Sequence, residues 1–255
     1  MRRQMALVAL LALLSGCPVP QRQDVPNPQQ SLKEPTTGRK YSLYVPSYYS
    51  ADRKWPLVVT LHGTYGWDGH VRQVKEWKYL AEQKGFIVAA PFLKSVQGIL
   101  PRFKKPWFKN LASDEKAILA LLDELIPKYS IDPNAVLLSG FSAGGYPMYH
   151  VGLRNPTRFS MLIARACNSS ISLFERIKFT DETRKLPVMI FWGKDDLKPI
   201  QDQSWEAFAY LRGRRKCFKT RKREIEGGHL RRPDIAYGLW EPHLPAEYKR
   251  PSEQQ

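Results

Sequence analysis

The stretch from Pro133 to Asn155 constrains the fold more than any other part of this chain. Ala135–Leu138 is a short apolar run with the length of a buried strand, and a helical pattern runs on to Asn155. Between them stands Gly140-Phe141-Ser142-Ala143-Gly144. Its two glycines permit a strained turn in which a Cβ would collide with neighbouring backbone. Strand, sharp turn bearing a serine, then helix is the context of a G-x-S-x-G nucleophile elbow.

Apolar runs alternate with helical patterns along the rest of the chain. Leu57–Leu61 is almost continuously apolar, as a strand covered by helices on both faces must be. Further strands are predicted at Tyr41–Val45, Phe86–Ala90, Phe159–Ala166, Pro187–Phe191 and Lys219–Ile225, and helices at Glu76–Lys84, Ser113–Tyr129 and Ser204–Arg212. In the clearest helix, Ser113 is the expected N-cap and Asp114 and Glu115 suit the first turn. This alternation predicts an α/β fold, with a mostly parallel central sheet and helices on both faces.

Length and composition fit one sizeable domain. The chain has 255 residues, 43% of them hydrophobic and 12% aromatic, which are globular values. Its 40 Lys and Arg residues outnumber 24 Asp and Glu residues, so the formal net charge is +16. Such an excess favours anionic surroundings: lipid headgroups, acidic polysaccharide or nucleic acid. No helix-turn-helix, zinc-finger or RNA-binding signature accompanies it, so we expect no nucleic-acid partner.

The first residues are typical of an export signal. Arg2 and Arg3 precede the apolar stretch Met5–Leu14, which is too short to span a bilayer about 30 Å thick. Leu14-Ser15-Gly16-Cys17 resembles the lipobox of bacterial lipoproteins, which implies cleavage before Cys17 and acylation of its thiol. The alternative is an ordinary signal peptide with an incidental cysteine. We therefore expect an extracytoplasmic, membrane-anchored lipoprotein of the periplasm or cell surface.

The expected domain organisation follows from composition. Residues 1–16 form the signal peptide, and residues 17–37, rich in Pro, Gln and Asn, form a flexible tether. Residues 38–240 form the folded domain and residues 241–255 a polar tail. The two remaining cysteines, Cys167 and Cys217, either pair or stay as buried free thiols.

A serine hydroxyl is a poor nucleophile at neutral pH and needs a base, which in turn needs an acidic partner. The chain has five histidines, and two of them precede the serine. His150 lies on the helix that the serine opens, roughly 12 Å along its axis at about 1.5 Å per residue. His229 follows the last predicted strand on a loop whose glycines, Gly227 and Gly228, allow close approach. We favour His229 as the base, with His243 in the Pro-flanked tail as the reserve.

The acidic partner is expected just beyond the strand Pro187–Phe191. Asp195 and Asp196 are adjacent there, in the run Gly193-Lys194-Asp195-Asp196. Consecutive side chains point in different directions, so only one of the two faces the histidine. Spacing alone leaves both open.

At this point the motifs carry a family resemblance. GFSAGG, the turn HGTYG at His62–Gly66, GKDD and GGH stand in the order found in the α/β-hydrolase fold. Within that fold, Gly38 to Trp240 resembles the secreted esterases grouped with polyhydroxybutyrate depolymerases and feruloyl or acetylxylan esterases. The resemblance implies a serine hydrolase of carboxylic esters that works through an acyl-enzyme and without cofactor or metal. It also implies that the acid lies three residues after Gly193, which selects Asp196.

An acyl-transfer site needs N–H donors aimed at the developing oxyanion. The backbone N–H of Ala143 begins a helix, where amides lack helical partners. The resemblance implies a second donor at Thr64, with Tyr65 the next choice, and a structural role for His62 in the same turn. Many polyester depolymerases of this group carry Cys where Thr64 stands, so this chain departs from the polyester pattern while keeping the esterase pattern.

Two further segments suggest binding surfaces. Leu93–Leu111 holds five cations and three aromatics, and is expected to be either a substrate platform or a surface loop pinned by its aromatics. In the first case Phe103 and Trp107 would stack on a sugar or phenolic ring, with Tyr65 beside them at the rim. Arg212–Arg223 has eight Lys or Arg in twelve residues, which fits a solvated basic face or a contact with anionic membrane beside the lipid anchor.

Two alternatives to the esterase interpretation remain open. A serine peptidase of the prolyl-oligopeptidase kind has the same order of motifs, although nothing like its propeller domain precedes the elbow. A lipoprotein that keeps the fold only for binding would carry the motifs without the activity. The sequence leaves the acyl and alcohol groups open, including polysaccharide-linked esters and polyesters, and gives no indication of oligomeric state.

Overall fold

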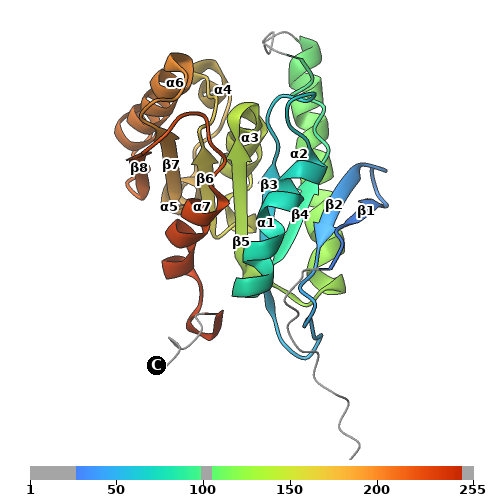
Figure 1. The fold of residues 1–255 in the computed structure, drawn as a ribbon. Helices are drawn as coiled ribbons and strands as arrows, with labels where there is room; N and C mark the ends of the chain where they lie inside the picture. The colour runs from blue at the N-terminus through green and yellow to red at the C-terminus, as the bar shows by residue number, and fades with distance from the viewer. Residues whose placement is uncertain (1–26, 99–104, 249–255) are drawn as a thin grey trace, which may run out of the picture.

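A computed structural model describes residues 27–98 and 105–248, which are built around one twisted sheet (Figure 1). Within these residues the sheet has eight strands in the order β1-β2-β4-β3-β5-β6-β7-β8. The strands are β1 (Gln30–Lys33), β2 (Lys40–Tyr44), β3 (Trp55–Leu61), β4 (Ile87–Pro91), β5 (Ile131–Phe141), β6 (Met161–Arg165), β7 (Val188–Gly193) and β8 (Thr220–Ile225). In the sheet order from β4 to β8 all neighbours pair in parallel, whereas β1 with β2 and β2 with β4 pair antiparallel. The predicted mostly parallel α/β sheet is confirmed.

Helices cover both faces of the sheet. The helices are α1 (His70–Lys84), α2 (Lys105–Lys128), α3 (Gly145–Arg154), α4 (Ile171–Glu175), α5 (Asp181–Lys185), α6 (Lys198–Ala209) and α7 (Pro233–Trp240). Helices α1 and α7 pack on one face, in front of the sheet in Figure 1, and α2, α3 and α6 pack on the other. Adjacent residues of β3 point to opposite faces of the sheet. Val58 packs with α1 and α7, whereas Leu57 and Val59 pack in the core on the side of α2, α3 and α6. The apolar run predicted for this strand therefore reflects burial on both faces.

The last strand has a different character because it is an edge. In β8 only Thr220 and Ile225 are buried, and the four residues between them are charged. Exposed cations on an edge strand discourage pairing with another chain. Part of the basic segment Arg212–Arg223 is therefore the protected edge of the sheet.

Both ends of the predicted domain need correction. Residues 17–37 were expected to be a flexible tether, but Gln30–Lys33 forms β1 and pairs with β2. The turn that follows is held by Glu34, whose carboxylate accepts the N–H groups of Thr36 and Thr37 at 2.5 and 2.7 Å. At the other end, residues up to 248 are not a free polar tail, because Leu244 is buried and the Tyr248 hydroxyl donates to Asp132 at 2.9 Å.

Several predictions fall on residues that the structure does not describe. The signal segment and Cys17 lie outside the described residues, as does Phe103. No helix within 27–98 and 105–248 has both the length and the apolar character needed to cross a membrane.

Helix α2 begins earlier than predicted, and a buried ion pair explains the error. It starts at Lys105, so Ser113 is not an N-cap and Asp114 lies in the helix interior. Asp114 is fully buried: Oδ1 accepts from Arg39 Nη1 at 2.5 Å and from the Lys94 N–H at 2.9 Å, and Oδ2 accepts the Ser95 N–H at 2.8 Å. The carboxylate that suggested a helix start instead ties α2 to the turn before β2 and to the loop after β4.

Replacing Asp114 should therefore destabilise the protein strongly. Asp114→Ala leaves the Arg39 guanidinium buried without its partner, and we expect a loss of about 3–5 kcal/mol in the free energy of unfolding. Urea unfolding followed by circular dichroism measures it. The control is Asp181→Ala, whose side chain is 87% exposed beside Arg184 and should cost less than about 1 kcal/mol. Equal midpoints for the two variants would contradict the assignment.

Candidate active site

The predicted strand, turn and helix around Ser142 are present at the carboxyl end of β5. Ser142 has φ 51°, in the left-handed region that non-glycine residues rarely adopt. Its N–H donates to Ala166 O at 3.1 Å and its carbonyl accepts the Asn168 N–H at 2.9 Å, so the segment after β6 fixes the strained residue. A Cβ on Gly144 would lie 2.5 Å from Leu61 O, which explains why glycine stands there. The turn presses against the end of β3.

The loops after β7 and β8 bring a histidine and an aspartate together. His229 Nδ1 lies 2.8 Å from Asp196 Oδ1, which also accepts the Leu197 N–H at 2.7 Å. A carboxylate only accepts, so Nδ1 of His229 carries the proton and Nε2 is left as the basic nitrogen. Asp196 is buried, whereas Asp195 is exposed, so Asp196 is the aspartate that faces the histidine. The ring of Phe141, the residue before the serine, lies 4.7 Å from the His229 ring.

A glycine makes this pairing of loops possible. A Cβ on Gly193 would lie 2.0 Å from Gly227 O and 2.3 Å from Gly228 O. Around it, the Lys194 N–H donates to Ile225 O at 2.8 Å and the Asp195 N–H to Gly227 O at 3.1 Å. The loop after β7 (residues 194–197, the acid loop) and the loop after β8 (residues 226–232, the histidine loop) are therefore in direct backbone contact.

The other histidines do not reach the serine. His150 Nε2 is bonded to Glu115 at 3.0 Å on the surface of α2 and α3, and His70 Nδ1 lies 2.9 Å from Ser42 Oγ. His243, the reserve candidate for the base, lines a cavity with Met161 and Val188, which are the first residues of β6 and β7. Since Ser142 follows the carboxyl end of parallel β5, His243 lies at the opposite edge of the sheet. The reserve assignment is wrong.

The loop after β3 passes directly beside the serine. A Cβ on Gly63 would lie 3.1 Å from the Ser142 Cβ. His62 is fully buried, and its Nε2 accepts the Leu93 N–H at 3.0 Å, so its Nδ1 carries the proton and donates to Gly63 O at 2.8 Å. Burial lowers the pKa of His62, which keeps the imidazole neutral. His62 therefore has the structural role that the resemblance implied.

This hydrogen bond also orients the candidate oxyanion donor. In a trans peptide the C=O and N–H point in opposite directions, so fixing Gly63 O directs the Thr64 N–H away from His62. The N–H of Tyr65, by contrast, donates to Val96 O at 3.0 Å and is occupied. Ala143 lies in the 3₁₀ turn Ser142–Gly144, whose first N–H groups have no helical acceptor. Thr64 and Ala143 are thus better placed as donors than Tyr65.

Three candidate residues, Thr64, Ser142 and His229, line one cavity of about 280 Å³. It is lined by Gly63, Thr64, Trp67, Asp68, Phe141, Ser142, Leu197, His229 and Arg231. Trp67 and Leu197 are 65% and 63% exposed, so two apolar side chains stand free at its rim. Sequence analysis missed Trp67 and Arg231, although one directly follows HGTYG and the other lies two residues after the candidate base.

The predicted aromatic rim is only partly present. Trp107 is 7% exposed, donates its Nε1–H to Ser95 O at 2.9 Å and packs edge-on against Tyr146. Trp107 is a core residue that holds the loop after β4 through Ser95, so its assignment as a substrate platform is wrong. Tyr65 is half exposed and lines a neighbouring hollow of about 530 Å³ with His70 and Arg72 rather than the serine cavity.

The two described cysteines are free and buried, so the alternative that they pair is wrong. Burial raises the pKa of the Cys167 thiol to about 12 and that of Cys217 to about 11. Neither is therefore a nucleophile at neutral pH. Among residues 27–98 and 105–248, no group of three or more His, Cys, Asp or Glu side chains could hold a metal ion.

Comparison with known proteins places the chain among esterases. A model of the Esterase family, described as "Putative esterase", matches residues 33–225. A bifunctional acetylxylan esterase/xylanase of Neocallimastix patriciarum is 30% identical over 118 residues, which is 46% of this chain and 16% of that protein. Dipeptidyl-peptidase 5 of Porphyromonas endodontalis is 27% identical over 141 residues, 51% of this chain and 20% of that protein. The chain thus matches about a fifth or less of these relatives' lengths.

A solved structure shares the fold. The CE1 ferulic acid esterase of Anaeromyces mucronatus superposes with a TM-score of 0.63 at 18% identity, covering 88% of this chain and 93% of that one. At this identity the likeness concerns the fold.

The contact at Gly193 gives a direct test of the site. Gly193→Ala should force the loops after β7 and β8 apart and separate Asp196 from His229, because the added Cβ meets backbone atoms. A displacement near 1 Å costs about hundredfold in rate, so kcat/KM for a short acyl ester should fall by that factor or more. The control is Gly213→Ala, where a Cβ meets nothing within 4 Å. Wild-type kcat/KM in Gly193→Ala would contradict this geometry.

Proposed function

We propose that this chain, which belongs to the Esterase family, hydrolyses carboxylic esters with Ser142 as nucleophile, His229 as base and Asp196 as the acid that orients the base. One observation carries the proposal. The strained serine shares a cavity with a histidine whose Nδ1 is held by a buried carboxylate, which leaves Nε2 free to accept a proton.

Each step follows from these positions. His229 Nε2 takes the proton of Ser142 Oγ as that oxygen attacks the ester carbonyl, and the N–H groups of Thr64 and Ala143 hold the oxyanion. Collapse of the tetrahedral intermediate passes the proton to the leaving alcohol and forms an acyl-enzyme. Water, deprotonated by the same nitrogen, then attacks the acyl carbonyl and releases the acid. One oxyanion donor typically contributes about 10²–10³ in kcat.

The substrate class is proposed from the cavity and the relatives together. The names of the relatives include an acetylxylan esterase and a ferulic acid esterase, that is, esterases of an acetylated carbohydrate and of an aromatic acid. A cavity of about 280 Å³ suits a small acyl group, and the exposed ring of Trp67 offers a flat face for a sugar or phenolic ring. Thr64 in place of Cys argues against polyesters. We propose short-chain or aromatic acyl esters of a carbohydrate as substrates.

The central test uses three variants. Ser142→Ala and His229→Ala should each lower kcat by about 10⁴-fold or more, since either removes a member of a unit that acts together. His243→Ala, at the opposite edge of the sheet, should keep the wild-type rate.

A fluorophosphonate probe should label the wild-type protein and fail to label Ser142→Ala. No labelling of the wild type would leave the binding-lipoprotein alternative, and labelling that survives in Ser142→Ala would refute Ser142 as the nucleophile.

A serine peptidase is the second candidate, and the match to a dipeptidyl-peptidase favours it. The same triad cleaves either bond, so substrate preference separates the two. Comparing acyl esters with dipeptide amides on the purified protein decides between them.

We further propose that the chain is an extracytoplasmic lipoprotein whose basic segment contacts anionic membrane. Phe218 is 63% exposed in the loop before β8. Its carbonyl accepts from Arg212 Nη1 at 2.8 Å and from Arg221 Nη1 at 2.5 Å, so two guanidinium groups converge beside an exposed aromatic ring. A single acyl chain, attached in this proposal at Cys17, binds membranes only marginally, and each nearby Lys or Arg adds about 1 kcal/mol on an anionic surface.

Vesicle flotation tests this contact. The unacylated protein should float with phosphatidylglycerol vesicles at low salt and stay behind with phosphatidylcholine vesicles. Combining Phe218→Ser with Arg221→Glu should weaken binding at least about tenfold, because it removes the apolar anchor and reverses one charge. The matched control is Tyr79→Ser with Lys75→Glu, a similar exposed pair on α1. Equal flotation of both double variants would contradict the assignment of this surface.

A further inference from the structure

A buried carboxylate lies where the loop after β3 (residues 62–69, called the oxyanion loop because it carries Thr64) meets α1. The Asp68 side chain is 3% exposed, and its Oδ2 accepts the Gly63 N–H at 2.8 Å and Gln73 Nε2 at 2.7 Å. Its Oδ1 accepts the Gly69 N–H at 2.9 Å. The Asp68 backbone N–H in turn donates to Thr64 O at 3.0 Å. Asp68 therefore holds both sides of the loop that carries the proposed oxyanion donor.

The histidine loop reaches the same carboxylate through Arg231. Arg231 Nη2 lies 3.5 Å from Asp68 Oδ1, and Nη1 lies 3.2 Å from Glu76 Oε1 on α1. The Arg231 guanidinium also lies over the ring of Phe141, the residue before the serine, with its Cζ 4.9 Å from the ring centroid. Since Arg231 follows His229 by two residues, its anchoring restrains the loop that presents the base.

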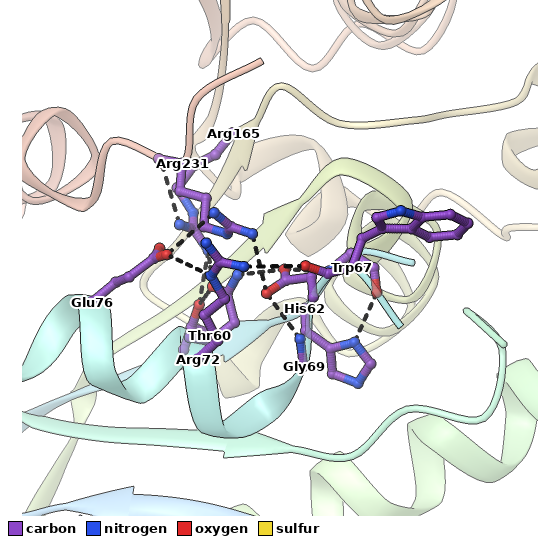
Figure 2. Close-up of polar contacts among 11 residues, drawn as sticks. Thr60, His62, Trp67, Gly69, Arg72, Glu76, Arg165 and Arg231 are labelled. Atoms are coloured by element: carbon purple, nitrogen blue, oxygen red, sulfur yellow. Dashed lines mark hydrogen bonds and ion pairs between the residues drawn. The ribbon is translucent and has the colours of Figure 1, made fainter. Parts of the chain in front are cut away.

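A fully buried arginine, Arg165, connects the histidine loop to α1. Arg165, at the end of β6, donates Nη1 to Arg231 O at 3.2 Å and Nη2 to Gln73 Oε1 at 2.7 Å. Burial lowers the pKa of Arg165 to about 10, so it remains charged at neutral pH. Figure 2 shows Arg165 and Arg231 together, with Glu76 facing them from α1 and the Trp67 ring directed away. The same guanidinium thus supports the histidine loop and the glutamine that holds Asp68.

We propose that Asp68 and Arg231 are positioning residues whose ion pair sets the distance between the oxyanion donors and the base. The inference rests on the proposed function. The oxyanion loop follows β3 and the histidine loop follows β8, and three strands separate them in the sheet. Strand pairing alone therefore does not fix one loop against the other. The ion pair supplies a direct link between the two loops in the lining of the cavity, where the oxyanion donors and the base must act on one carbonyl.

The network predicts a particular kinetic pattern. Asp68→Asn keeps the shape and an acceptor for Gly63 but removes the charge that Arg231 needs, and Arg231→Gln removes the other partner. Each should lower kcat by about tenfold to hundredfold with KM changed less than about threefold, because loop position affects the transition state more than ground-state binding. The double variant should be no slower than the slower single variant, since both break one link. Arg231→Lys, which keeps the charge, should recover part of the rate.

A second ion pair on the protein serves as control. Glu115→Gln and Arg154→Gln disrupt a contact of 3.0 Å between α2 and α3, away from the cavity, and should keep the wild-type kcat. All rates are measured well below each variant's own melting temperature, so that lower stability by itself does not lower kcat. If Asp68→Asn fails to fold, Asp68→Glu, which keeps the charge but moves it by one methylene, carries the test with the same expected fall in kcat.

The outcomes separate this inference from the proposed function. If Ser142→Ala retains activity, the proposed function itself fails. If Ser142→Ala is inactive while the Asp68 and Arg231 variants keep the wild-type kcat, only the positioning role fails. A rise in KM without a fall in kcat would assign Arg231 to direct substrate contact and overturn the proposal, and so would losses that multiply in the double variant.

Discussion

The close approach of two backbones at the centre of the sheet is the constraint on which the site depends. The turn after β5 packs so tightly against the end of β3 that Gly144 has no room for a Cβ, and Gly63 lies against Ser142. This backbone contact by itself puts Ser142, the proposed nucleophile, beside the loop that carries the proposed oxyanion donor. The parallel strands add the rest, because their carboxyl ends meet at one edge and deliver the loops after β7 and β8 to the same place.

A buried charge lies next to these loops. Arg165 is buried without a carboxylate in direct contact among the described residues, and it is satisfied instead by Ser139, Thr60, Gln73 and the carbonyl of Arg231. An unpaired buried charge is costly, so these partners must hold their positions. The Arg165 guanidinium thereby holds the loop of His229 directly and the loop of Thr64 through Gln73 and Asp68.

Local sequence predicted elements well where one physical signal dominated. The elbow, the central strands and the alternation with helices followed from glycine placement and apolar runs. Errors arose where a residue type has two uses. Asp114 matched a helix start but serves a buried ion pair, and Trp107 matched a stacking platform but fills the core. Polar composition before Gly38 concealed β1, because an edge strand needs little apolar surface.

The sequence by itself predicted the side chains that we propose carry the chemistry: Ser142 from its turn, His229 from its glycine-rich loop, and two adjacent aspartates after β7, of which the family resemblance selected Asp196. The tertiary structure brings Asp196 against the histidine, and it alone decided that His243 lies at the far edge of the sheet and that Asp68 meets Arg231. The reason is physical. Turns and strands are specified by residues close together in the chain, whereas the distance between two loops depends on how every strand between them packs.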